Sequence, residues 1–228
     1  MKKITPYILV VSDWVFPFFS FSQVKSDLFR HNLKGKVHTT LESEYSPAGN
    51  LNKLNKENLK HREFIEYNEQ GYIIQMKEYD SKNMLITTRK IILDKDEKRI
   101  VAFDYNLNNQ IKSIDSFKYD LNGNRIEDLI YNPNYTLVKK MISRYDSNGV
   151  VIETCIYNSY NNLVDGYKFR IGNSGEPTKA DYFNKDSIVV GTNTYQYYDF
   201  DKEGNSQKNV TYYTGFIDII STTKIEYY

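Results

Sequence analysis

The chain has 228 residues, with 30 Lys and Arg against 29 Asp and Glu, so its formal net charge is +1 at pH 7. Tyr occupies 21 positions and Cys one. A nearly neutral chain gives no electrostatic basis for binding nucleic acid or an anionic membrane surface, and a lone cysteine excludes an internal disulfide.

Residues 1–22 have the pattern of a secretory signal peptide. Two lysines precede an apolar run from Ile8, and Ser20 and Ser22 supply the small residues expected before a cleavage site at Gln23. Cleavage would lower the net charge from +1 to 0 by removing two Lys and one Asp. We therefore expect export to the periplasm, the cell surface or the medium, with no membrane span left after cleavage. Polar interruptions of the run leave an uncleaved anchor and a cytosolic protein as alternatives.

The next segments differ in composition. Residues 23–34 mix apolar and polar side chains and are interpreted as a leader into a first strand at 35–45. A turn follows at 46–49, and residues 51–62 are rich in Lys and Asn, which favours a long hairpin tip or a short helix. An irregular insertion of this kind is a candidate for carrying specificity.

From Glu63 onward the sequence repeats every 26 residues. Tyr119-Asp120-x-x-Gly123 recurs as Tyr145-Asp146-x-x-Gly149, and looser copies begin at Tyr67, Leu93, Ile171 and Phe200. A second series lies half a period away, each aromatic residue being followed by Asp or Asn: Tyr79, Tyr105, Tyr131, Tyr157 and Phe183. A fixed period of this size indicates a repeat architecture.

Each unit is typical of a β-hairpin. Asp and Gly stand at the first and fourth positions of a type I turn, where the Asp side chain caps backbone N–H groups and Gly accepts a positive φ. About eight residues with strand composition separate successive turns. The residues assigned structural turn roles are Gly71, Asp120, Gly123, Asp146 and Gly149.

Repeated hairpins predict an all-β fold for residues 23–228. We expect an antiparallel meander of about twelve to fourteen strands in a single twisted or curled sheet, with the last unit capping an exposed edge. Whether such a sheet is flat or curled is left open by the sequence. Replacing Gly123 or Gly149 with Val is expected to damage folding.

The motif from Tyr119 to Ile126, together with its copy from Tyr145 to Ile152, resembles the YD repeat of Rhs-type proteins. The likeness is closest to short exported repeat proteins common in Bacteroidota and covers residues 37–228. Large members of that family wrap such strands into a shell around a toxin. This chain has no toxin-like tail and lacks the Asp-Pro-x-Gly signature, so encapsulation is not carried over. What the resemblance adds is toxin neutralisation as a possible role.

Few side chains form a convergent reactive pattern. His31, His38 and His61 match no standard metal spacing, and the Asp and Asn residues around Asp120 are explained by turn capping without calcium. Cys155 has no His near it in sequence, which favours a structural thiol. We therefore predict no catalytic residue, no metal and no cofactor.

The functional hypothesis is that tyrosine side chains bind a ligand. Flat phenol rings suit sugars or protein side chains, and the candidate ligand-binding residues are Tyr105, Tyr119, Tyr131, Tyr145 and Tyr157. Stabilisation of a half-exposed sheet is the alternative role for these rings. The function predicted is an exported, non-enzymatic repeat protein that binds a protein or polysaccharide of the cell envelope, and not nucleic acid.

Two alternatives remain. One is a toxin-neutralising component. The other is a glycan-acting enzyme or accessory subunit using paired carboxylates, for which Glu42 with Glu44 or Glu127 with Asp128 are candidates. Two carboxylates sharing one concave pocket would favour the enzyme.

Overall fold

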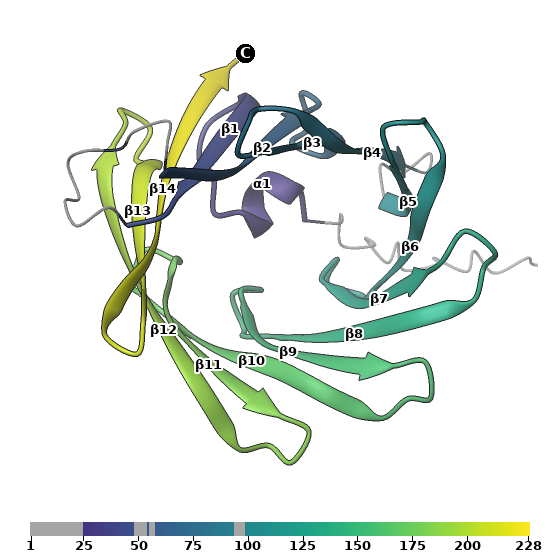
Figure 1. The fold of residues 1–228 in the computed structure, drawn as a ribbon. Coiled ribbons are helices and arrows are strands. Elements are labelled where there is room, and N and C mark those ends of the chain that lie inside the picture. The colour runs from purple at the N-terminus through teal and green to yellow at the C-terminus, as the bar shows by residue number, and fades with distance from the viewer. Residues whose placement is uncertain (1–24, 48–53, 55–57, 94–98) are drawn as a thin grey trace, which may run out of the picture.

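The computed structural model describes residues 25–47, 54, 58–93 and 99–228. In these residues a short helix is followed by fourteen antiparallel strands that close into a barrel (Figure 1). The elements in chain order are α1 (Asp27–Arg30), β1 (Val37–Tyr45), β2 (Leu59–Tyr67), β3 (Ile73–Asp80), β4 (Leu85–Leu93), β5 (Arg99–Tyr105), β6 (Ile111–Tyr119), β7 (Arg125–Tyr131), β8 (Leu137–Tyr145), β9 (Val151–Asn158), β10 (Leu163–Ile171), β11 (Pro177–Asn184), β12 (Val189–Phe200), β13 (Ser206–Tyr213) and β14 (Phe216–Tyr227).

The antiparallel meander is confirmed, but the expected sheet with an exposed last edge is wrong. Each strand pairs with its sequence neighbour, and β14 also pairs with β1, so that Thr40 lies opposite Ile225 and Ser43 opposite Thr222. Closure satisfies the backbone N–H and C=O groups that both edges of an open meander would expose. The last unit therefore closes the sheet instead of capping it.

The hairpin turns are built from local hydrogen bonds. At Asp120 the carboxylate accepts from the N–H groups of Asn122 and Asn124 at 2.9 and 2.8 Å, while Gly123 donates to the Asp120 carbonyl and has φ +76°. The same pair of side-chain bonds occurs at Asp80, Asn106, Asp146, Asn158, Asn184 and Asp201. Such bonds fix each turn from four or five residues of sequence.

The two ends of the barrel differ in the residue that takes the positive φ. Successive turns of a meander lie at opposite ends. At one end, here called the glycine end, this residue is Gly71, Gly123, Gly149, Gly175 and Gly204. At the opposite end it is Asn83, Asn109, Tyr135, Asn161 and Ser187 in five turns, and Thr214 together with Gly215 in the turn between β13 and β14. The left-handed conformation therefore does not by itself demand glycine in this protein.

The outer wall mixes aromatic rings with lysines. Four lysine ammonium groups lie 4.9 to 5.7 Å from the centre of a ring on the neighbouring strand. These pairs are Lys77 with Phe64, Lys90 with Tyr105, Lys140 with Tyr157 and Lys168 with Phe183. Each lysine stem covers a ring while its charged end stays in water, which stabilises an aromatic surface without a second layer.

Candidate binding site in the barrel lumen

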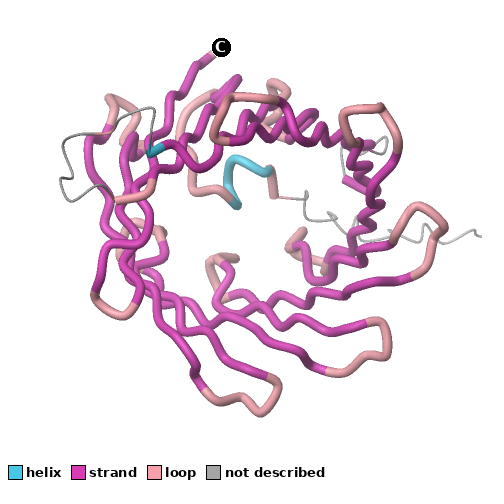
Figure 2. Tube along the Cα trace, viewed as in Figure 1, coloured by secondary structure: helices cyan, strands magenta, loops and turns pink. Residues whose placement is uncertain are grey.

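Residues 25–34, here called the plug, enter the barrel at the glycine end. Figures 1 and 2 show α1 inside the ring of strands, against β1 to β3. Leu28 and Leu33 pack there on the buried cluster of Val37, Ile65, Tyr67 and Ile73. The segment leads into β1, as expected, and it also packs inside the barrel, where Leu28 and Leu33 contact the lumen wall.

The plug is bonded to five hairpin turns. Each turn at the glycine end for which a contact is described offers a backbone carbonyl near its third or fourth position, and the distances are 3.1 to 3.3 Å. The donor and acceptor residues are Leu28 to Gly71, Arg30 to Gly123, Lys25 to Asn148, Asn32 to Ser174, and Lys34 to Gly204. One segment thus ties together turns that are 133 residues apart between Gly71 and Gly204.

Close contact with the plug favours glycine at Gly71, Gly149 and Gly175. A Cβ added at Gly71 would lie 2.9 Å from the Leu28 Cδ1 atom and 3.3 Å from the Ser26 Cβ atom, and one at Gly175 would lie 3.0 Å from the Asn32 Oδ1 atom. At Gly204 the contact would be an ordinary one, and Gly215 at the opposite end has open space around it. Five turns at the opposite end carry Asn, Ser or Tyr in the same conformation.

Two buried polar side chains anchor the plug. Asp27 is 1% exposed, and its carboxylate accepts from the Ile73 N–H and from Arg30, both at 2.8 Å. Asn205 is 2% exposed and holds the backbone of Lys34 from both sides, accepting from its N–H at 2.8 Å and donating to its carbonyl at 2.9 Å. Buried polar groups that are fully bonded fix a segment in one position.

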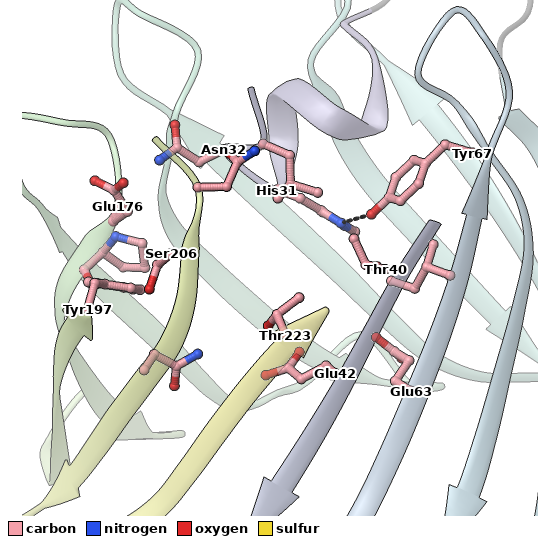
Figure 3. Close-up of a pocket in the computed structure, with 15 residues that line it drawn as sticks. His31, Asn32, Thr40, Glu42, Glu63, Tyr67, Glu176, Tyr197, Ser206 and Thr223 are labelled. Atoms are coloured by element: carbon pink, nitrogen blue, oxygen red, sulfur yellow. Dashed lines mark hydrogen bonds between the residues drawn. The ribbon is translucent and has the colours of Figure 1, made fainter. Parts of the chain in front are cut away.

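Beyond the plug the lumen holds two adjoining cavities. Chamber 1 has a volume of about 320 Å³, and polar and apolar surface contribute about equally to its wall (Figure 3). Its lining consists of His31, Asn32, Leu33, Thr40, Glu42, Glu63, Ile65, Tyr67, Glu176, Pro177, Tyr197, Asn205, Ser206, Asn209 and Thr223. Three carboxylates and one histidine are present, and none of these lining residues is Lys or Arg. The His31 Nδ1 atom lies 3.0 Å from the Tyr67 hydroxyl.

The carboxylates of chamber 1 belong to a row across three strands. Glu42 on β1 lies directly opposite Glu63 on β2, which lies directly opposite Glu78 on β3. Burial raises the pKa of Glu63 to about 7, and the negative charges of Glu42 and Glu78 add to this effect while Arg89 opposes it. Burial also raises the pKa of Glu42, against a hydrogen bond from Ser221.

Arg89 on β4 lies opposite Met76, two residues along β3 from Glu78, but its guanidinium is paired with other carboxylates. Its guanidinium contacts both carboxylate oxygens of Asp104 at 2.6 and 2.7 Å and reaches Asp115 at 2.9 Å. Two carboxylates therefore share one guanidinium. The row of Glu42, Glu63 and Glu78 is flanked in the register by Thr223 and Thr87, so the carboxylates act on one another without a directly opposed cation.

Chamber 2 is larger, about 500 Å³, and more apolar. Phe29, Tyr145, Val150, Val151, Phe169 and Ile171 contribute most of its apolar lining. It shares His31, Asn32, Pro177 and Tyr197 with chamber 1, so the two volumes meet there. The Tyr197 hydroxyl donates to the Pro177 carbonyl at 2.9 Å, and burial raises the pKa of this phenol above its usual range.

The five tyrosines predicted to bind ligand are divided between the two faces of the wall. Tyr145 lines chamber 2, and the Tyr119 ring lies 5.3 Å from the Arg30 guanidinium of the plug. Tyr105 and Tyr157 lie on the outer wall with their lysines, and Tyr131, opposite Ile114, faces outward as well. The series that precedes glycine turns therefore points inward, and the half-period series points outward.

The predicted turn residues lie together under the plug. Asp120, Gly123, Asp146, Gly149 and Gly71 all belong to turns of the glycine end. Residues 1–22, and the part of the 51–62 insertion at 51–53 and 55–57, lie outside the described residues. The sequence reasoning missed Glu63 and Tyr197, and it assigned no role to His31. The change from glycine to non-glycine turns was the signal available for finding the plug.

Other reactive groups are sparse. Cys155 is a free thiol whose pKa is raised by burial and by Glu153. Across the described ranges, no set of three His, Cys, Asp or Glu side chains is placed to hold a metal ion. The same part of the chain contains no helix with the length and apolar character needed to cross a membrane.

No protein-family model matches the chain, and no curated protein matches it in sequence. Solved structures similar to this chain include the following three. A porin-like protein from Bacteroides uniformis is 10% identical over 90% of this chain and 100% of its own, with a TM-score of 0.47. The Tc holotoxin pore of Photorhabdus luminescens is 9% identical over 80% of this chain and 11% of its own, with a TM-score of 0.32. A LolA superfamily protein from Nitrosomonas europaea is 9% identical over 89% and 92%, with a TM-score of 0.26.

These likenesses are too distant to assign a family or a ligand. The resemblance to the YD repeat, which rests on the turn motifs, therefore stays a prediction. The functional argument below uses the residues of the lumen.

Proposed function

We propose that the protein is an exported, non-enzymatic barrel that binds a polysaccharide of the cell envelope in its lumen. The observation that carries this proposal is the lining of the two adjoining chambers. Aromatic rings at Tyr145, Phe169 and Tyr197 stand among carboxylates, amides and hydroxyls. Rings that stack on a sugar face, with polar groups that bond its hydroxyls, are the combination that sugar recognition requires.

The lumen favours a polysaccharide over a folded protein partner. Both chambers fall in the range of volumes typical of small-ligand pockets, about 300 to 1,000 Å³. A folded partner would instead need a broad complementary surface, of about 800 Å² on each side. Location at the envelope is supported by the signal-peptide pattern of residues 1–22.

Two neighbouring tyrosines test the proposal. Tyr197 lines both chambers, whereas Tyr198 is exposed on the outer side of the same strand. The chain from Gln23 onward would be immobilised and challenged with glycan fractions of the envelope. Tyr197→Ala should abolish glycan retention, and Tyr198→Ala should not.

Two further measurements separate binding from folding. Tyr197→Phe keeps the ring and should retain glycan, while the melting temperature of each variant shows whether the barrel is intact. Equal retention by Tyr197→Ala and wild type would place the ligand outside the lumen and contradict the proposal.

A second candidate, a glycan hydrolase, is favoured by one observation. Glu42 and Glu63 share a concave pocket, and a carboxyl with a pKa of about 7 beside a second carboxyl is the pattern of a general acid. Incubation with the retained glycan decides between the two. Release of reducing ends that stops in both Glu42→Gln and Glu63→Gln would establish hydrolysis, and no release from wild type supports the binding protein.

A further inference from the structure

The charge of the lumen limits the class of glycan that it can bind. Three carboxylates line chamber 1, and two of them continue into the row of Glu42, Glu63 and Glu78 on adjacent strands. Directly opposed residues on neighbouring strands have Cβ atoms about 5 Å apart, and like charges in that arrangement repel each other. The chamber is therefore built around a concentration of negative charge.

Neither Lys nor Arg is among the residues that line the chamber. Arg89 is shared by Asp104 and Asp115, and Arg30 in the plug is paired with Asp27 and bonded to the Gly123 carbonyl. His61 opposes the charge of Glu42, and Arg89 opposes that of Glu63, yet the pKa of both carboxyls is raised. A group that brings positive charge into the chamber would relieve the repulsion among these carboxylates.

The shape of the site identifies the kind of cation. The described residues contain no trio of side chains arranged around a metal ion. The carboxylates are instead spread along the wall and interleaved with Asn32, Asn209 and Thr223, and the site continues into rings at Tyr197 and Phe169. An ammonium group with three donors can bond the directly opposed Glu42 and Glu63 together with one amide or hydroxyl oxygen, and the sugar ring attached to it would stack on the aromatic side chains.

We infer that the lumen selects oligosaccharides that carry free amino groups, with an ammonium between Glu42 and Glu63 in chamber 1 and the neighbouring sugar in chamber 2. This inference rests on the proposed function, because it names the class of glycan that the same site takes. N-acetylation of the amino group would remove both the charge and the donors that the carboxylates require.

The experiment compares two sugars that differ in that group alone. The tetramer of β-1,4-linked glucosamine and the tetramer of N-acetylglucosamine would be titrated into the chain from Gln23 at neutral pH by calorimetry. We expect the free amine to bind at least 10-fold more tightly, and its affinity to fall as NaCl is added.

A matched pair of variants locates the charge that is responsible. Glu63 and Glu66 lie on the same strand, Glu63 in the chamber and Glu66 opposite Thr39 on the outer wall. Glu63→Gln should reduce the preference for the free amine by at least 5-fold, and Glu66→Gln should leave it unchanged.

The outcomes separate this inference from the proposed function. Equal or tighter binding of the acetylated tetramer, or an unchanged preference in Glu63→Gln, overturns the amine selectivity and leaves glycan binding in place. Binding of neither tetramer overturns the inference. If the envelope glycan fractions are not retained either, the proposed function fails with it.

Discussion

Glu63 shows how a single side chain couples the lumen to stability. Its pKa is raised from 4.5 to about 7 in the folded protein, chiefly by burial. The folded state therefore binds more protons than the unfolded state between these values, so the free energy of unfolding falls as the pH rises from about 4.5 to about 7. Above pH 7 the full free-energy cost of burying the ionised Glu63 carboxylate is present, with an upper limit of about 3 kcal/mol.

Glu63→Gln should remove this cost. The variant is expected to be more stable than wild type at pH 8, by up to about 3 kcal/mol, with little difference near pH 4, where both side chains are neutral. Urea unfolding at the two pH values measures this change, with Glu66→Gln as the control on the outer wall. A Glu63→Gln variant that is less stable at pH 8 would show that the carboxylate makes interactions worth more than its burial costs.

Gly71 tests whether contact with the plug requires glycine in a turn. Asparagine tolerates a positive φ, as Asn109 does at the opposite end, so Gly71→Asn changes mainly the contact with Leu28. We expect a loss of about 1 to 3 kcal/mol from overpacking, which lowers the melting temperature by several degrees. Asn109→Gly is the matched control and should have a smaller effect. Similar melting temperatures for the two variants would mean that the plug does not constrain the turns.

At the scale of elements, hairpins and plug depend on different information. Each turn is specified locally, since Asp120 bonds to residues two and four positions ahead, and turns of this kind follow from the sequence motif. The plug depends on contacts between Lys25 and Asn148 or Lys34 and Gly204, which no local pattern encodes. The sequence of the plug alone indicates only a leader, because the residues that its side chains contact are spread over the whole chain.

Asp27→Ala should release the plug while the wall stays folded. The substitution leaves the Ile73 N–H and the Arg30 guanidinium without this carboxylate inside the barrel, a loss typically worth several kcal/mol. Limited trypsin digestion followed by mass spectrometry would measure cleavage after Lys25, Arg30 and Lys34, which we expect to be at least 10-fold faster. Asp186→Ala, in an exposed turn, is the control. Unchanged cleavage would show that the turn contacts suffice to hold the plug.

At the scale of the whole molecule, closure joins segments about 180 residues apart in the chain, with Ser43 directly opposite Thr222. The meander was predictable because neighbouring strands pair through short turns. Closure was not, because the match between β1 and β14 has no local sequence signature. The lumen exists only because the barrel is closed. The sequence therefore contained no indication that Glu63 and Tyr197 line the same chamber.

A cross-link tests closure directly. In a Cys155→Ser background, Ser43→Cys with Thr222→Cys places two thiols on directly opposed positions and should give an intramolecular disulfide under mild oxidation. Ser43→Cys with Thr192→Cys, on β12, should remain reduced. Gel mobility with and without reductant distinguishes the products. Absence of the first cross-link in folded protein would indicate an open sheet.

The two kinds of turn also govern how such a barrel can change in size. One 26-residue unit contributes two strands, one turn at the glycine end and one turn at the opposite end. A tandem duplication of this unit would therefore widen the lumen, and all the remaining side chains would keep their inward or outward direction. Half a unit would reverse the direction of all the strands that follow. Each added unit would also bring one more turn carbonyl to the glycine end, so a wider descendant would need a longer amino-terminal segment to span its opening.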